Sequence, residues 1–244
     1  MTRSANRAMG AVLTSNPVTA PLLPLLRSWR HRRRANRLYA RYRKWTMIPR
    51  AQFADNLWLC REFGTLPGLV IECGVWRGGM IAALAQLLGP ERTYYLFDSF
   101  EGLPPADLLK DGERAVNWMA RAVSQPNDPW GTLRAEIELA EAAMRLSGAR
   151  QYHLVKGWYK DTLASFVPPA PIAILRLDAD WYDSIRQCLE ALYPHVAAGG
   201  LILIDDYYTW DGCARAVHEY LAKQKGQDRI RQSPAGVAYI IKAS

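Results

Sequence analysis

Two apolar segments of the chain each end in a pair of acids, and these residue types at this spacing could support metal chemistry. IAILRLDAD ends with Asp178 and Asp180, and LILIDD ends with Asp205 and Asp206. If the segments are neighbouring strands of a parallel sheet, they lie ~4.8 Å apart, so Asp178, Asp205 and Asp206 converge. Such carboxylates repel unless one stays protonated or a cation lies among them. Because Mg²⁺ prefers oxygen ligands, we predict that these three aspartates hold a divalent ion.

The remaining acid of the group, Asp180, is predicted to be a general base. It lies two residues after Asp178, so the two side chains would share one face if the strand continued through both. A free carboxylate, with a pKa of ~3.9, is a weak base, but a metal lowers the pKa of a bound hydroxyl. The alternative interpretation is helix capping, in which Asp180 or Asp183 caps the helix that follows and Asp206 caps the next.

A glycine-containing turn, ECGVWRGG (72–79), follows the first apolar strand. Glycine allows close approach and positive φ, so this turn could lie against a ligand. A dinucleotide-binding turn needs G-x-G-x-x-G, whereas Trp76 stands where the second glycine should be. Glu72 would repel a phosphate but suits the ammonium group of S-adenosylmethionine. Asp98 ends the next strand, where it is placed for ribose hydroxyls, although a plain tight turn is the alternative interpretation.

The elements that must position these residues alternate between apolar strands and helices. This alternation indicates a parallel sheet with helices on both faces, in which ligands bind at the carboxyl ends of the strands. The acids lie at those ends. Between the second and third strands, residues 99–150 form an insert, with loops at its start and around 124–131 and a helix to about residue 146. The expected strands are 69–73, 93–98, 152–157, 172–178, 200–206 and 235–241, and the expected helices are 52–63, 80–89, 183–193 and 212–225.

The positive charge of the chain is confined to its beginning. The 244 residues suit one α/β domain with an appendage, and the net charge is +8. Residues 1–54 hold twelve of the 31 Lys and Arg and none of the 23 Asp and Glu, so the remainder is mildly acidic. Residues 27–44 carry nine of these cations with interleaved aromatics. They predict either a solvated helix or a surface for an anionic partner. If this arm is only an appendage, trimming residues 1–40 leaves catalysis intact.

Composition excludes several other classes of protein. The four cysteines are scattered without a C-x-x-C pair, which favours reduced thiols, and hence a cytoplasmic protein, over a disulfide framework or zinc site. The four histidines form no H-E-x-x-H motif. No apolar run reaches the ~18 residues that span a bilayer, and the proline-broken start is a poor signal peptide. A D-x-D phosphatase needs its motif on the first strand, and a dehydrogenase fails on glycine spacing.

Together these segments resemble the macrocin O-methyltransferase family, whose members methylate sugar hydroxyls of antibiotics. The resemblance rests on motifs that follow in order over about residues 45–242, and it implies a Rossmann-like class I methyltransferase fold with a seven-stranded, mostly parallel sheet and helices on both faces. It also implies S-adenosylmethionine as methyl donor, Mg²⁺, a glycosylated small-molecule acceptor and a homo-oligomer. The matching stretches are YRKWTMIPR, VIECGVWRGG, FDSFEGLP, VKGWYKDTL, LRLDADWYDS, LYPHVAAGGLILIDDYYTWDG and GVAYIIK.

The resemblance also implies roles for particular residues. Residues 45–244 would be the methyltransferase domain, and residues 1–44, which precede the resemblance, are predicted from their charge to form a basic arm, partly disordered or helical. The metal ligands would be Asp178, Asp205 and Asp206, with Asp180 as general base. A methyltransferase-like protein that binds through its basic arm, without turnover, is the alternative. The residues implied in cofactor binding are Thr46, Met47, Glu72, Gly74, Arg77, Gly78, Gly79, Asp98, Ser99 and Trp158.

Overall fold

The computed structural model describes residues 22–62, 65–124, 133–224 and 226–243, with side chains from residue 30 onward. Seven strands form one sheet in the order β3-β2-β1-β4-β5-β7-β6. The first five are mutually parallel, and β7 runs antiparallel to both of its neighbours. The strands are β1 (Leu69–Cys73), β2 (Thr93–Asp98), β3 (Gln151–Lys156), β4 (Ile172–Leu177), β5 (Val196–Ile204), β6 (Arg231–Gln232) and β7 (Ala238–Ile241).

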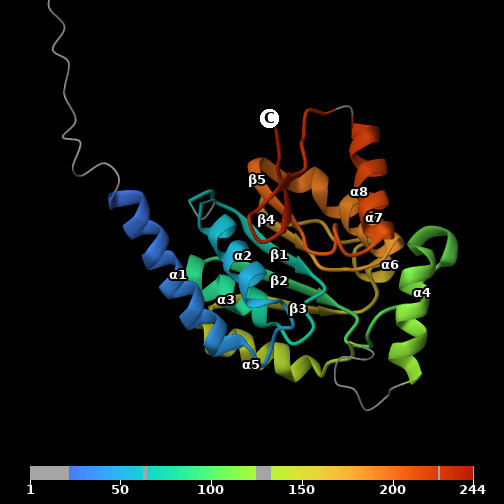
Figure 1. The fold of residues 1–244 in the computed structure, drawn as a ribbon, viewed down its shortest axis with the longest axis horizontal. Coiled ribbons are helices and arrows are strands. Elements are labelled where there is room, and N and C mark those ends of the chain that lie inside the picture. The colour runs from blue at the N-terminus through green and yellow to red at the C-terminus, as the bar shows by residue number, and fades with distance from the viewer. Residues whose placement is uncertain (1–21, 63–64, 125–132, 225, 244) are drawn as a thin grey trace, which may run out of the picture.

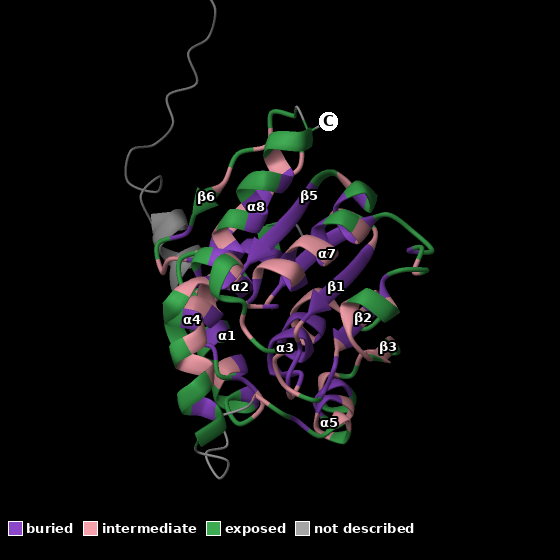
Figure 2. Ribbon diagram, turned by 90° about the vertical axis from the view of Figure 1, so that its right-hand side faces the viewer, coloured by how far each residue is buried: buried purple, intermediate pink, exposed green. Residues whose placement is uncertain are grey.

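Helices cover both faces of this sheet (Figure 1). One apolar cluster packs α1, α2, α3 and α5 on one face, and a second packs α6, α7 and α8 on the other, where α4 contacts α7 and α8. Figure 2 shows the buried strands between helices whose outer surfaces are exposed. The helices are α1 (Leu22–Tyr42), α2 (Arg50–Glu62), α3 (Gly79–Leu88), α4 (Leu108–Ser124), α5 (Ile137–Ser147), α6 (Tyr159–Thr162), α7 (Tyr182–Leu192) and α8 (Asp211–Gln224), with a 3₁₀ turn at Tyr193–His195.

These layers confirm the predicted fold class, and the differences from prediction are local. The strand β4 ends at Leu177, one residue before its predicted end. The condition under which Asp178 and Asp180 would share a strand face is therefore not met, and Asp180 has a left-handed φ of +55°. The helix α4 was not predicted, because a glycine with positive φ at position 112 breaks its pattern. The short strand β6 was also missed, since two exposed polar residues carry no strand signal.

The second half of the basic arm packs against the domain. Ala35, Leu38 and Tyr42 of α1 are almost fully buried, so trimming residues 1–40 would remove part of the core. Arg34 donates to carbonyls near the carboxyl end of α3, and Arg41 to the carbonyl of Leu146 in α5. Cations are favourable at helix carboxyl ends, so part of the basic charge is structural. Residues 1–21 of the predicted arm lie outside the described residues.

None of the helices in the described ranges combines the length and the apolar character needed to cross a membrane. All four cysteines carry free, buried thiols.

Candidate active site

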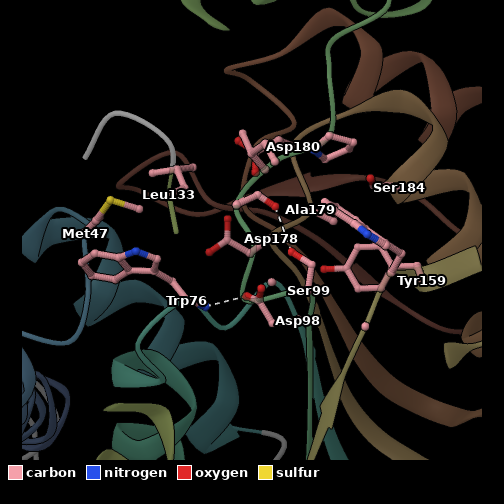
Figure 3. Close-up of a pocket in the computed structure, with 16 residues that line it drawn as sticks. Met47, Trp76, Asp98, Ser99, Leu133, Tyr159, Asp178, Ala179, Asp180 and Ser184 are labelled. Atoms are coloured by element: carbon pink, nitrogen blue, oxygen red, sulfur yellow. Dashed lines mark hydrogen bonds between the residues drawn. The ribbon is translucent and has the colours of Figure 1, made fainter. Parts of the chain in front are cut away.

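A pocket opens where the parallel strands end (Figure 3). The empty space in it, including the part that is open to solvent, is about 580 Å³. Its walls come from the segments that follow β1, β2, β3 and β4, together with the segment before α2. The lining residues are Met47, Gly74, Trp76, Asp98, Ser99, Gly102, Leu103, Pro104, Leu133, Gly157, Trp158, Tyr159, Asp178, Ala179, Asp180 and Ser184.

The segments that leave the strands are tied to one another by backbone hydrogen bonds. In four cases the first residue beyond a strand donates its N–H to the last or next-to-last residue of a neighbouring strand, so the sheet ladder extends one step into the loops. We call these four donors, Gly74, Gly157, Asp178 and Asp205, the strand-tip rim. The bonds run from Gly74 to Phe97, Gly157 to Asp98, Asp178 to Cys73 and Asp205 to Leu177, at 2.8 to 2.9 Å.

Asp178, Asp205 and Asp206 converge at this rim, as the sequence predicted. One carboxylate oxygen from each lies within 4.8 Å of the others. Asp206 is buried, and its Oδ2 has no hydrogen-bond partner. Burial and the neighbouring carboxylates raise the pKa of Asp206 well above its ordinary value. Burial likewise raises the pKa of Asp205, to about 6. The cluster is therefore short of positive charge, as expected for residues that could hold a cation.

A buried arginine that the sequence analysis missed lies beneath these acids. Arg176 is fully buried on β4 and donates to Glu72 at 2.5 Å, to Asp178 at 2.8 Å and to Asp205. Burial alone would lower the pKa of Arg176, but the charges of Asp205, Asp178 and Glu72 outweigh it and hold this pKa above its ordinary value. One feature of the sequence could have indicated this residue: it is the single cation inside the apolar segment IAILRLD. A cation that is buried in a strand needs an acidic partner.

Asp180 points into the pocket in Figure 3 and accepts a hydrogen bond of 3.1 Å from the indole Nε1 of Trp210. Burial, reinforced by the charge of Asp178, raises the pKa of Asp180 to about 8. The capping alternative is not supported for these acids. The N-cap of α7 is Trp181 and it makes no side-chain cap bond, and α8 begins at residue 211, beyond reach of Asp206 as its N-cap.

The unpredicted helix α4 completes the surroundings of Asp180. Its Trp118 packs edge-to-face with Trp181 and Trp210, at ring-centroid distances of 6.3 and 5.8 Å. Buried Asp111 ties the start of α4 to α7 by accepting the N–H of Tyr182 at 2.8 Å. An apolar wall of three tryptophans thus lies beside the one carboxylate proposed to move a proton.

The glycines of the first turn are explained by contacts within the chain. A Cβ on Gly74 would lie 1.6 Å from the carbonyl oxygen of Asp178, and one on Gly79 would lie 2.5 Å from the carbonyl oxygen of Trp45. Gly78 has a φ of +77° and packs against α5. The sequence suggested that these glycines allow close approach to a ligand. The contacts give a second reason: without a side chain, these positions let neighbouring segments of the chain pack together.

Asp98 supports the walls of the pocket. Its two carboxylate oxygens accept the N–H groups of Trp76 at 2.8 Å and Phe100 at 2.7 Å, which fixes the turns after β1 and β2. Burial raises the pKa of Asp98, and these backbone bonds oppose the rise. The Ser99 hydroxyl donates to the carbonyl of Gly102 at 2.9 Å.

The ten predicted cofactor residues separate into two groups. Met47, Gly74, Asp98, Ser99 and Trp158 line the pocket. The others support it from behind and are not among the lining residues. Of these, Thr46 Oγ1 accepts the N–H of Ile48, buried Glu72 pairs with Arg176, and Arg77 lies 4.2 Å above the ring of Trp76, while Gly78 and Gly79 open α3.

This architecture defines the class of protein. A sheet of order 3-2-1-4-5-7-6 with an antiparallel β7, helices on both faces and a pocket at the carboxyl ends is the class I methyltransferase fold. The solved structure of the O-methyltransferase NovP shares it, with a TM-score of 0.68, 29% identity, and coverage of 82% of this chain and 83% of that one.

Sequence relatives are enzymes of the same class. The chain is 35% identical over 187 residues to the 8-demethyl-8-(2,3-dimethoxy-alpha-L-rhamnosyl)-tetracenomycin-C 4'-O-methyltransferase of Streptomyces olivaceus, covering 73% of this chain and 68% of the relative. It is 36% identical over 179 residues to the demethyldecarbamoylnovobiocin O-methyltransferase of Streptomyces niveus, covering 69% of this chain and 65% of the relative. The matched part thus spans about two thirds of the length of these relatives.

The macrocin-O-methyltransferase (TylF) family matches residues 27–239. The chain belongs to this family and is an S-adenosylmethionine-dependent O-methyltransferase. The predicted resemblance is thereby confirmed, and the alternative of a binding protein without turnover is not favoured. The homo-oligomer, the cytoplasmic location, the anionic partner of the arm and the boundary at residue 45 stay predictions.

Proposed function

We propose that this enzyme transfers a methyl group from S-adenosylmethionine to a hydroxyl of a sugar or glycosylated natural product, with a divalent ion such as Mg²⁺ held by Asp178, Asp205 and Asp206. The observation that carries the metal is the convergence of these three carboxylates around a buried Asp206 oxygen without a partner. The acceptor class is supported by relatives whose names specify methylation of a rhamnosyl tetracenomycin and of a novobiocin precursor.

Residues around the pocket suit the parts of S-adenosylmethionine. Asp98 and Ser99 at the end of β2 offer acceptors for ribose hydroxyls, and Trp158 offers an aromatic surface for the adenine. The turn 72–79, with Thr46 and Met47 across from it, would surround the methionine part. Because Glu72 pairs with Arg176 and does not line the pocket, we expect its charge to act at a distance, through the local potential.

The metal ligands suit a hard cation because all three offer carboxylate oxygens. A divalent ion held there would lower the pKa of an acceptor hydroxyl, and S-adenosylmethionine, when bound, supplies the methyl group and leaves as S-adenosylhomocysteine. Asp180 takes the hydroxyl proton, while the acceptor oxygen forms its bond to the methyl carbon. The hydrogen bond from Trp210 fixes the Asp180 carboxylate, and the tryptophan wall limits its access to water.

Asp205→Ala tests the metal role directly. We expect this variant to lose methyl transfer, by at least ~100-fold, because a metal ligand is removed, while S-adenosylmethionine still binds. Methylation would be followed by mass spectrometry as the gain of one methyl group over a panel of glycosylated acceptors, and cofactor binding by calorimetry. EDTA should abolish wild-type turnover and added Mg²⁺ should restore it. Full activity of the wild type in EDTA would contradict the metal.

A further inference from the structure

We infer that Arg176 is a positioning residue, which sets Asp178 and Asp205 in the arrangement that receives the metal ion. The inference rests on the proposed function, because it concerns the ion proposed there. Arg176 itself is fully buried beneath the acids, so it reaches neither acceptor nor cofactor in the pocket. Its role would be exerted through the two carboxylates that it holds.

The sheet register explains how one side chain reaches all of these acids. Arg176 lies opposite Glu72 of β1 and opposite Leu203 of β5. Side chains two residues apart share a face of a strand, so Asp178 and Asp205 follow Arg176 and Leu203 toward the same face, the one covered by α2. A cation at this position therefore meets acids from three adjacent strands.

Hydrogen bonds hold the guanidinium from two sides. On the side of the rim, Nη1 donates to Asp178 Oδ2 and Nη2 to Asp205 Oδ1. On the opposite side, Nη1 also donates to Glu72 Oε1 and Nε to Asn56 Oδ1 of α2, at 3.3 Å. Asn56 is itself buried and donates to a backbone carbonyl one turn earlier in α2. The planar guanidinium is thus oriented by Glu72 and Asn56 independently of its contacts with the proposed metal ligands.

The charge balance shows why such a residue is needed. Five acids lie together at the ends of β1, β4 and β5, namely Glu72, Asp178, Asp180, Asp205 and Asp206. Arg176 is the one cation that the structure, within its described ranges, pairs with any of them. Without it, Asp178 and Asp205 would repel each other and turn apart in the metal-free protein. Because Arg176 engages one named oxygen of each, it also fixes the direction in which each carboxylate faces. Positioning of ligands by such outer partners typically changes metal affinity ~10–100-fold.

The test separates this geometry from charge. Arg176→Lys keeps the positive charge but loses the planar guanidinium with its several N–H donors. Asn56→Leu leaves Arg176 in place but removes the acceptor that orients it. Arg186→Lys is the matched control, because Arg186 is half-exposed and its ion pairs, among the residues that the structure describes, are with Asp183 and Glu190 on the surface of α7. Mg²⁺ alone would be titrated into each purified, full-length protein by calorimetry, with thermal unfolding measured in EDTA.

We expect Arg176→Lys to lower Mg²⁺ affinity about tenfold and Asn56→Leu on the order of threefold, with Arg186→Lys unchanged. In turnover assays the Mg²⁺ concentration for half-maximal activity should rise in parallel, while kcat at saturating Mg²⁺ falls less than about threefold. This split is expected of a positioning residue and not of a general loss of stability.

Different failures point to different proposals. If the wild type takes up no Mg²⁺, the metal of the proposed function is wrong. If the wild type binds Mg²⁺ and both variants bind it as tightly, Arg176 is only a structural ion pair and this inference is overturned. Should Arg176→Lys fail to fold, Asn56→Leu decides alone: unchanged Mg²⁺ affinity in that folded variant would also overturn the inference.

Discussion

At the scale of single residues, Asp180 carries the proposed proton transfer. Its carboxylate accepts a hydrogen bond from Trp210 and its backbone is left-handed, and it lies beside the three proposed metal ligands without being one of them. General bases contribute ~10²–10⁴-fold to rate, because proton removal accompanies attack by the acceptor oxygen. The assignment therefore predicts a loss of rate without a loss of cofactor binding.

Asp180→Asn should lower kcat by ~100-fold or more, with S-adenosylmethionine affinity within about twofold of wild type. The amide oxygen can still accept from Trp210, so the pocket should keep its shape. Steady-state assays and cofactor calorimetry would measure the two quantities, and exposed Asp161→Asn on α6 is the control. Near wild-type kcat would remove Asp180 from the mechanism.

The acids of the site could be predicted from sequence, and their partner could not. Asp178, Asp205 and Asp206 interrupt apolar runs at strand ends, where parallel strands bring side chains together. Arg176 is one cation in a run of apolar residues. Its contacts with the acids depend on its position opposite Glu72 in the sheet, and the sequence alone does not specify that register. Asp180 was also predicted at the site, but the sequence did not show that it follows the end of β4 with a left-handed φ of +55°.

At the scale of elements, the turn after β1 depends on glycine for contact with the segment after β4. Gly74→Ala combines a φ of +86° with a Cβ placed 1.6 Å from the Asp178 carbonyl oxygen. We expect a loss of about 3 kcal/mol or more in unfolding free energy. Gly148→Ala is the control, because Gly148 has a left-handed φ of +82° but open space around its Cβ; its cost should be about 1 kcal/mol. Denaturant titration would compare them, and equal costs would contradict the steric explanation.

Elements were predicted well wherever burial imposed a pattern. The strands β1 and β2 match their predicted ranges residue for residue, because they are short apolar runs bounded by turn residues. The insert was predicted poorly: α4 has a strongly exposed outer face, and its position is set by tertiary contacts such as that of Asp111 with Tyr182. The part of the site least visible in sequence is thus α4, whose Trp118 packs against the tryptophans beside Asp180.

At the scale of the whole molecule, α1 joins the arm to the domain. Removal of residues 1–44 deletes the buried side chains of Ala35, Leu38 and Tyr42 and should cost about 5 kcal/mol, which lowers Tm by ~10–20 °C. Removal of residues 1–29 leaves these contacts in place and should change Tm by no more than ~2 °C. Scanning calorimetry would compare both with the full chain. Equal Tm values for the two truncated proteins would show that α1 is only an appendage.

The charge distribution also belongs to the whole molecule. Arg34 and Arg41 remain exposed but contact the carboxyl ends of α3 and α5, so at least two cations of the basic arm also support the fold. Composition alone could locate this charge in the chain. It could not show which of the cations support the fold, because that depends on which helix ends lie beside α1.

The strand-tip rim has a consequence for how an acceptor is accommodated. Its four amides extend the sheet ladder past the strands, so the first residues of these loops are as firmly bonded as the sheet itself. Adjustment to substrates of different bulk then has to come from outside the rim, from α4 and the loops beside it. Evolution within this scaffold could exchange one acceptor for another by altering that outer layer, while the rim, which includes the proposed metal ligands Asp178 and Asp205, stays unchanged.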